Sequence, residues 1–205
     1  MRAALFDLDG VLIDTEGTYS KFWSEMGDRF NVGIDHFSDV IKGTTLDQII
    51  GNYFPAEVHP QIIAELDVFE ENMKYHTFPG VIEYLEQLKA QGIPAAMVTS
   101  SNNGKLERLW EQLPGFKDYF KVIISDADVQ RSKPDPQGYL LAAQALGVKP
   151  EDCTVFEDSF NGLLAGRRAG CRVVALSTTN PAESLADKAD HVIASFNELL
   201  TLQAL

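Results

Sequence analysis

Two acidic side chains, Asp7 and Asp9, follow an apolar run that begins at Ala3 and are themselves followed by Gly10. Side chains two residues apart on a strand point to the same side, so both carboxylates can face one ligand. Carboxylates this close repel each other, and a divalent cation or a shared proton is needed to hold them together. Because no His or Cys lies nearby, a hard, oxygen-ligated ion such as Mg²⁺ fits.

Two other readings of this segment compete with metal binding. Asp9-Gly10 could form a hairpin turn, although no partner strand follows it. An EF-hand loop needs glycine at its sixth position, whereas Gly10 occupies the fourth. We interpret Asp14 as the N-cap of the next helix rather than as a ligand. Alone, the motif leaves a functional and a structural role equally open.

Three later segments also place polar side chains at or near the ends of apolar runs. Thr99 and Ser100 precede a helix, where hydroxyls and backbone N–H groups suit a phosphate, although an ordinary N-cap cluster is the alternative. Lys133 is held before a proline, and a fixed ammonium suits a phosphoryl oxygen or a carboxylate; a solvated surface lysine is the alternative. Glu157 and Asp158 end a buried run, where adjacent acids are better explained by metal coordination than by folding.

The elements that must position these residues form an alternating pattern of apolar and amphipathic segments. Strands are expected at Ala3–Leu8, Pro94–Thr99, Val122–Ser125, Thr154–Glu157, Val173–Leu176 and His191–Ile193, and helices at Val81–Gln91 and Gln137–Leu146, among others. This alternation predicts an α/β fold, a Rossmann-like parallel sheet with helices on both faces. Such a sheet gathers its carboxyl ends in one crevice, which would bring all four motifs together.

A helical insertion interrupts the pattern after the first strand. Helices are expected at Thr18–Phe30, Leu46–Tyr53 and Gln61–Tyr75, and the chain from 15 to 76 shows no convincing strand. We therefore predict a core domain of residues 1–14 and 79–205 and a helical cap domain of residues 15–78 that covers the site.

Composition narrows the classes of partner. The 205 residues carry a formal net charge of −13, which argues against nucleic acid or an anionic membrane surface. No apolar run is long enough to span a membrane, and the N-terminus does not resemble a signal peptide, so a cytoplasmic location is expected. Cys153 and Cys171 are expected to be buried, reduced thiols, and the four histidines lack metal-ligand spacing.

The four motifs resemble, in order and spacing, those of the haloacid dehalogenase-like superfamily of phosphatases and phosphomutases. The matching positions are Asp7 and Asp9, Thr99, Lys133-Pro134, and Glu157-Asp158. The resemblance runs from Met1 to about Leu200. The insertion is similar to the small helical cap found after the first strand in one branch of the family.

The resemblance implies a mechanism and a metal site. Asp7 would attack phosphorus and form an aspartyl-phosphate, and Asp9 would protonate the leaving alcohol and later deprotonate water. Mg²⁺ would bind the Asp7 carboxylate, the Asp9 main-chain carbonyl and Asp158, with Glu157 as a further ligand or as a support outside the ligand set. In addition, Thr99, the N–H of Ser100 and Lys133 would hold the phosphoryl oxygens.

Within the family, the chain resembles β-phosphoglucomutase and sugar-phosphate phosphatases. The expected substrate-contacting residues are Lys42, Gly43, Thr44, Thr45, Ser101 and Asn103. The mutase has a histidine where this chain has Tyr19, and an arginine that binds a second phosphate where this chain has Leu46. Because Leu46 carries no charge, we predict a phosphatase acting on a sugar phosphate, with the mutase as the alternative. Phe22 and Trp23 are interpreted as cap core rather than as substrate contacts.

Two further classes of protein are considered. A receiver-type signalling module also phosphorylates an aspartate beside Mg²⁺, but it lacks a helical insertion and carries that aspartate on a middle strand. A non-catalytic phosphoacceptor or ligand-binding protein on the same scaffold is disfavoured because every motif residue is present. The expected partner is a small phosphorylated metabolite, with no nucleic acid and no membrane; the sequence leaves monomer or dimer open.

Overall fold

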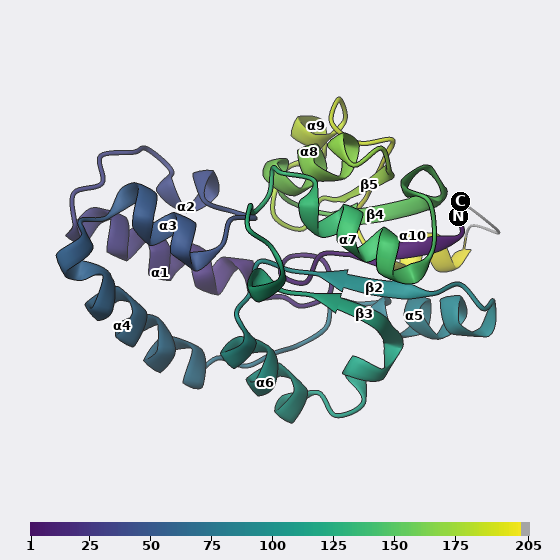
Figure 1. The fold of residues 1–205 in the computed structure, drawn as a ribbon, viewed down its shortest axis with the longest axis horizontal. Helices are drawn as coiled ribbons and strands as arrows, with labels where there is room; N and C mark the ends of the chain where they lie inside the picture. Colours follow the sequence, from purple (N-terminus) through teal and green to yellow (C-terminus); the bar gives the residue numbers. More distant parts are fainter. Residues whose placement is uncertain (202–205) are drawn as a thin grey trace.

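The computed structural model describes residues 1–201, whose strands form one six-stranded parallel sheet (Figure 1). The strands are β1 (Ala3–Phe6), β2 (Ala95–Val98), β3 (Phe120–Ile124), β4 (Cys153–Glu157), β5 (Arg172–Leu176) and β6 (His191–Ile193). Their order across the sheet is β3-β2-β1-β4-β5-β6, and every neighbouring pair is parallel. The predicted α/β class is confirmed, and β1 lies at the centre of the sheet.

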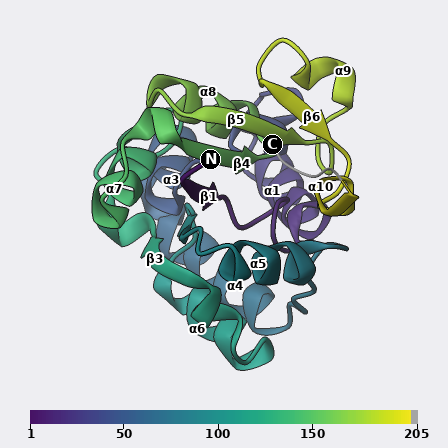
Figure 2. The same ribbon diagram turned by 90° about the vertical axis from the view of Figure 1, so that its right-hand side faces the viewer.

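Helices cover both faces of this sheet (Figure 2). One face packs against α5 (Val81–Ala90), α6 (Asn103–Gln112) and α10 (Asn197–Thr201), and the other against α7 (Gln137–Leu146), α8 (Phe160–Arg168) and α9 (Ala182–Leu185). Alternation along the strands explains the two layers: Ala4 and Phe6 of β1 belong to the first core, Ala3 and Leu5 to the second. All four side chains are fully buried, as the unbroken apolar run predicted.

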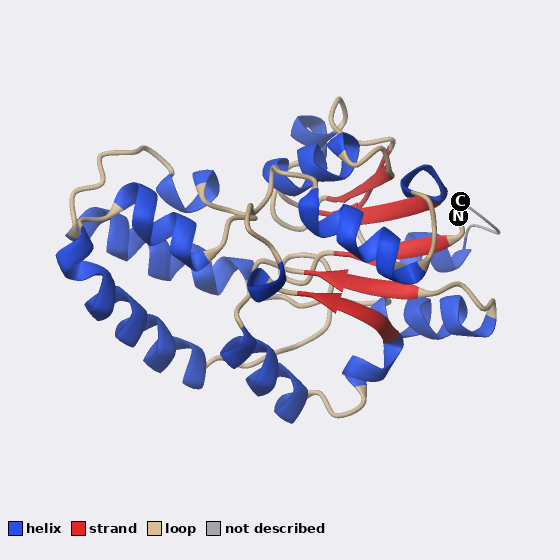
Figure 3. Ribbon diagram, in the orientation of Figure 1, coloured by secondary structure: helices blue, strands red, loops and turns tan. Residues whose placement is uncertain are grey.

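The remaining α-helices lie beyond the carboxyl ends of the strands, toward which the strand arrows point in Figure 3. They are α1 (Glu16–Arg29), α2 (Phe37–Val40), α3 (Leu46–Tyr53) and α4 (His59–Glu71). These four helices bury an apolar cluster of their own, which includes Phe22, Trp23 and Met26. The interpretation of Phe22 and Trp23 as core residues is thereby confirmed, and Trp23 additionally lines the cavity described below.

Two predictions about the helical insertion are wrong. Asp14 is exposed and does not cap α1: the N-cap position is Thr15, whose hydroxyl donates to Asp9 and accepts no hydrogen bond from the N–H groups of the helix. The helix predicted to reach Tyr75 ends at Glu71, because the chain then extends and buries Met73 and Tyr75 in the core of the sheet. Tertiary packing overrides the helical spacing there.

The structure also shows the state of the two cysteines and the character of the helices. Cys153 and Cys171 are both buried and unbridged, as expected. Across the described residues 1–201, none of the helices combines the length and the apolar character that a membrane span requires.

Candidate active site

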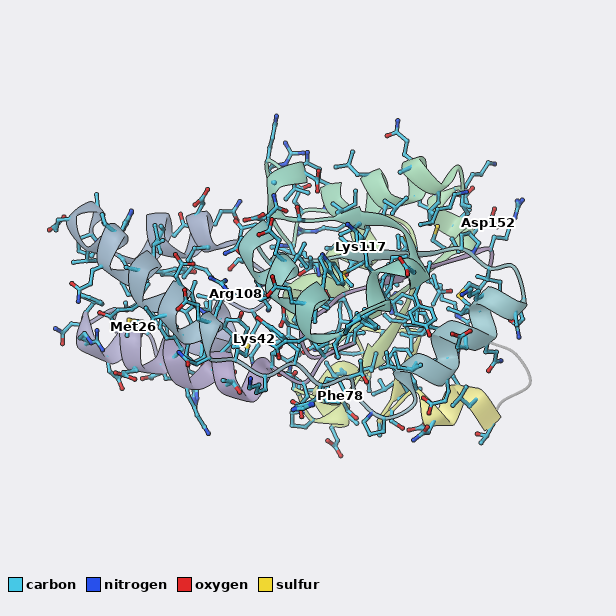
Figure 4. The ribbon with its side chains drawn as sticks, turned by 90° about the horizontal axis from the view of Figure 1, so that it is seen from below. Met26, Lys42, Phe78, Arg108, Lys117 and Asp152 are labelled. Carbon is cyan, nitrogen blue, oxygen red and sulfur yellow. The ribbon has the colours of Figure 1, made fainter. Side chains whose placement is uncertain are left out.

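A cavity of ≈120 Å³ lies between the carboxyl ends of the strands and helices α1–α4. Among the residues predicted to form the site, its lining includes Asp7, Asp9, Thr99, Ser100, Ser101 and Asp158 from the sheet domain, and Lys42, Gly43 and Thr44 from the loop before α3. Lys42 appears in Figure 4 at the junction between the two parts of the molecule. Four predicted residues are not among the lining residues: Thr45, Asn103, Lys133 and Glu157. Thr45 is buried at the N-cap of α3, Asn103 is exposed at the start of α6, and Lys133 and Glu157 are buried.

Lys133 lies behind Asp7 as a buried counter-ion. Its Nζ is 2.5 Å from Asp7 Oδ1, 2.6 Å from Glu157 Oε1 and 3.2 Å from the carbonyl oxygen of Val98. All three ammonium protons can therefore be donated within the protein. Only 6% of Lys133 is exposed, which rules out the solvated surface lysine considered above.

The electrostatic environment of Asp7 is dominated by burial. Burial raises the pKa of Asp7 to about 8, the nearby Glu157 adds to this effect, and the Lys133 ammonium opposes it. Without a further cation, the site therefore favours the protonated form of Asp7, which is a poor nucleophile. A divalent cation beside the carboxylate would reverse that preference.

Glu157 is fully buried and accepts hydrogen bonds at both carboxylate oxygens. Oε1 accepts from Lys133 and from the Tyr139 hydroxyl at 3.0 Å; Oε2 accepts from the N–H groups of Asp158 and Ser159, at 2.9 and 3.0 Å, and from the Ser159 hydroxyl. This pattern favours Glu157 as a support that orients Lys133 and the Asp158 segment over Glu157 as a direct metal ligand.

The place of Glu157 depends on a glycine in α8. A Cβ added at Gly162 would lie 1.7 Å from Glu157 Oε1, whereas a Cβ at Gly51, an exposed glycine of α3, would meet nothing within 4 Å. Gly162→Ala is therefore expected to lower the free energy of unfolding by about 2–4 kcal/mol through overpacking. Gly51→Ala should raise it by about 0.5–1 kcal/mol. Urea denaturation measures the free energy of unfolding of both variants. Equal changes in Gly162→Ala and Gly51→Ala would contradict the placement of Glu157.

Three buried acids form a cluster that could hold a metal ion between Asp7 and Asp158, with Glu157 as their support. One carboxylate oxygen from each of Asp7, Glu157 and Asp158 lies within 4.8 Å of the others. Asp158 is packed against the backbone turn at Gly10, where an added Cβ would lie 2.1 Å from Oδ2 and φ is +77°. Oxygen donors and an excess of acids over the one lysine suit a hard divalent cation, so the residues fit Mg²⁺.

Asp9 lies at the cavity wall and is held at both carboxylate oxygens. Oδ1 accepts from the Thr15 hydroxyl and from Lys105 Nζ at 2.5 Å, and Oδ2 accepts from the Ser101 hydroxyl at 3.0 Å. Sequence reasoning missed both Thr15 and Lys105. A signal existed for Lys105: it falls in the first turn of α6, where the helix dipole disfavours a cation.

The hydroxyl-rich segment after β2 contains residues that line the cavity and residues that hold the local structure. Thr99 Oγ1 accepts from the N–H of Ser101 at 3.0 Å, and the Ser100 hydroxyl donates to the Gly43 carbonyl at 2.8 Å. Asn102 caps α6 by accepting from the N–H of Lys105 at 2.8 Å. The N-cap alternative is therefore correct for Asn102, while Thr99 and Ser100 line the cavity.

A second set of polar contacts crosses from α1 and α4 to α6. The Tyr19 hydroxyl donates to Glu70 Oε1 at 2.8 Å, and Arg108 Nη1 donates to Glu70 Oε2 at 3.0 Å. Burial raises the pKa of Glu70. The hydrogen bond from the Tyr19 hydroxyl and the positive charges of Lys105 and Arg108 oppose this rise. Arg108 is labelled in Figure 4, beside the helices that it joins. These contacts tie α1 and α4 to α6.

The geometry matches a known family of enzymes. A family model described as haloacid dehalogenase-like hydrolase matches residues 1–170. The chain belongs to this family, and it is a hydrolase of that type.

Its relatives include several phosphatases. Validoxylamine A 7′-phosphate phosphatase from Streptomyces hygroscopicus subsp. limoneus is 33% identical, with 97% of this chain and 95% of the relative covered. Hexitol phosphatase A from Escherichia coli K12 is 31% identical, with 97% and 93% covered. The chain spans only 53% of a 31% identical bifunctional riboflavin kinase/FMN phosphatase from Arabidopsis thaliana. Among solved structures, β-phosphoglucomutase (pgmB) from Clostridium difficile superposes with a TM-score of 0.77 at 25% identity, covering 97% of this chain and 93% of that one.

Proposed function

We propose that this chain is a Mg²⁺-dependent phosphatase that hydrolyses a small phosphorylated metabolite, a sugar phosphate, through phosphorylation of Asp7. One observation carries the proposal: the buried Asp7 carboxylate, paired with Lys133 and close to Asp158, opens into a covered cavity lined by Asp9. The names of the relatives as phosphatases of phosphorylated small molecules support the same class of reaction.

The first half-reaction transfers the phosphoryl group to the protein. An Asp7 carboxylate oxygen attacks phosphorus in line, the ester P–O bond breaks, and Asp9 gives its proton to the departing alkoxide oxygen. Thr99, the N–H of Ser100 and Lys133 stabilise the charge on the phosphoryl oxygens. When bound by Asp7, Asp158 and the Asp9 carbonyl, Mg²⁺ would supply the positive charge that screens Asp7 from the phosphate.

The second half-reaction releases inorganic phosphate. Asp9, now ionised, takes a proton from water as that water attacks the phosphorus of phospho-Asp7. The bond between phosphorus and the Asp7 oxygen breaks, and the Asp7 carboxylate is regenerated. One side chain thus serves as acid and then as base, which requires that its carboxylate stay aimed at the reacting phosphorus.

Charge in the cavity favours hydrolysis over the mutase alternative. A mutase must bind a second phosphate, and Leu46, which lines the cavity at the expected position, carries no charge. The two lysines of the cavity each pair with an acid: Lys42 with Asp39 at 2.8 Å, and Lys105 with Asp9 at 2.5 Å. The cavity therefore suits an ester with one phosphate and a neutral remainder.

Phosphate release with and without metal tests the proposal. We expect the wild-type protein to release phosphate from p-nitrophenyl phosphate, acetyl phosphate and at least one member of a sugar-phosphate panel in Mg²⁺. EDTA should abolish release, and excess Mg²⁺ should restore it. Conversion of β-glucose 1-phosphate plus its bisphosphate activator into glucose 6-phosphate, without net phosphate release, would establish the mutase instead. No turnover of any ester would leave the non-catalytic alternative.

We also propose that residues 15–78 act as a cap that closes over bound substrate and opens for release. The contacts of Ser100 with Gly43 and of Asn161 with Lys42 support this, because both join the loop before α3 to the edge of the sheet. The cytoplasmic location and the monomer or dimer state stay predictions.

A further inference from the structure

Lys105 occupies the active-site cavity without a role in the phosphoryl transfer described above. Its Nζ lies 2.5 Å from Asp9 Oδ1 and 4.2 Å from the centre of the Tyr19 ring. The residue is only 3% exposed, although it lies on a helix of the molecular surface. The ammonium is therefore enclosed between the acid Asp9 and an aromatic face from α1.

The stability of the fold does not explain this position. A cation in the first turn of a helix opposes the helix dipole, and burying an ammonium costs several kcal/mol unless it is paired. The carboxylate of Asp9 and the face of Tyr19 offset this cost, and both belong to the cavity. A lysine buried in such a place is better explained by what it does to Asp9.

The contact with Lys105 completes the set of donors around the Asp9 carboxylate. The Ser101 hydroxyl donates to Oδ2 at 3.0 Å, while Lys105 and the Thr15 hydroxyl donate to Oδ1. Donors on both oxygens restrict rotation of the carboxylate group about its bond to Cβ. Among these donors, only the ammonium carries charge, and charge-assisted hydrogen bonds are roughly twice as strong as neutral ones.

The position of Lys105 is in turn set by the helices that cover the cavity. Tyr19 of α1 presents its ring to the ammonium, and its hydroxyl is fixed by Glu70 of α4. Glu70 is itself tied to Arg108, one turn after Lys105 on α6. The ring can therefore lie over Lys105 only while α1 and α4 rest against α6.

We propose that Lys105 is a positioning residue that orients the Asp9 carboxyl group so that the proton it carries can pass to the leaving oxygen of the substrate. This inference rests on the proposed phosphatase function. Lys105 acts through Asp9 and contributes no bond to the phosphorus. Its effect should consequently depend on how much the leaving group needs a proton, because p-nitrophenolate departs readily without one and an alkoxide does not.

A leaving-group series tests the proposal in the 205-residue chain with Mg²⁺. The kcat/KM values of wild type and Lys105→Met are compared on p-nitrophenyl phosphate, phenyl phosphate and glycerol 1-phosphate. Since kcat/KM reports only the steps up to phosphorylation of Asp7, the second half-reaction does not enter the comparison. We expect a loss of about 10–100-fold on the poorer leaving groups, part of the 10²–10⁴-fold that a general acid contributes. The loss on p-nitrophenyl phosphate should be less than about 3-fold.

Three variants calibrate this series. Asp9→Asn should also lose more kcat/KM on the poorer leaving groups, and its loss should exceed that of Lys105→Met because it removes the acid itself. Lys149→Met removes the same charge from a side chain that is 78% exposed, and it should leave all three values unchanged. If Lys105→Met does not fold, Lys105→Arg takes its place, because it keeps the charge but positions its nitrogens differently. Its loss of kcat/KM should again be confined to the poorer leaving groups and should be smaller.

The outcomes separate the two levels of inference. An equal loss on all three esters, no loss, or a gain on the poorer leaving groups would overturn the role of Lys105 while leaving the phosphatase intact. A wild-type protein that cleaves none of the esters would overturn the proposed function itself.

Discussion

Replacing Asp7 by asparagine is expected to abolish phosphate release, with a fall in kcat on the order of 10⁴–10⁶-fold, as for removal of other catalytic nucleophiles. The amide has nearly the shape of the carboxylate and can still accept a hydrogen bond from Lys133, so the geometry of the site should be kept. It cannot, however, form a stable bond to phosphorus. Phosphate release from p-nitrophenyl phosphate and from acetyl phosphate measures the effect.

Asp7→Asn should also change how the free energy of unfolding depends on pH. Because burial raises the pKa of Asp7 to about 8 in the metal-free protein, the unfolded chain releases this proton near pH 4 and the folded chain retains it. The contribution of Asp7 to stability therefore falls as pH rises from about 4 to 8. In EDTA, the stability of Asp7→Asn relative to wild type should rise across that window. Asp118→Asn, at an exposed position, is the matched control for the stability measurement and should show no such change with pH. In the activity assay, retained turnover in Asp7→Asn would contradict the assignment of Asp7 as the nucleophile.

Replacing Lys133 by methionine is expected to produce the largest loss of stability among these variants. The side chain pairs with both Asp7 and Glu157, and its removal leaves the fully buried Glu157 carboxylate without its counter-ion and Asp7 without its donor. Breaking a buried pair in this way costs about 3–5 kcal/mol. Activity should be lost as well, because the proposed mechanism uses the ammonium to stabilise the transferred phosphoryl group. Urea denaturation in EDTA measures the first effect and phosphate release the second.

A surface lysine and the metal provide the controls for this prediction. Lys149→Met breaks an exposed ion pair in which Lys149 Nζ lies 3.8 Å from Glu151 Oε1. It should change the free energy of unfolding by no more than about 0.5 kcal/mol. Mg²⁺ should narrow the deficit of Lys133→Met, since a bound cation would replace part of the missing charge. A deficit below about 1 kcal/mol in EDTA would show that Lys133 is not the counter-ion of this cluster.

Much of the fold follows from local sequence patterns. Apolar runs located all six strands to within about two residues. The unbroken runs mark strands such as β1 and β4, which are buried on both faces. The position of Asp7 and Asp158 followed from the same patterns, because polar residues at the end of a buried strand can only project from the carboxyl edge of the sheet. The boundaries of the predicted helices were less accurate where the chain after α4 finds apolar partners on the sheet.

The partners of each polar side chain depended on the tertiary structure. Nothing near Lys105 in the sequence indicates Asp9, 96 positions away, and nothing near Glu157 indicates that its oxygens are taken up by Lys133 and Tyr139. Local sequence also suggested Asp14 as a helix cap, where the structure uses Thr15 to hold Asp9. The sequence by itself determined the α/β class, the order of the strands along the chain and the acids at their ends, because these depend on the periodicity of neighbouring residues. Only the tertiary structure decided which charges pair and which side chains reach the cavity, because these depend on how elements distant in the chain pack together.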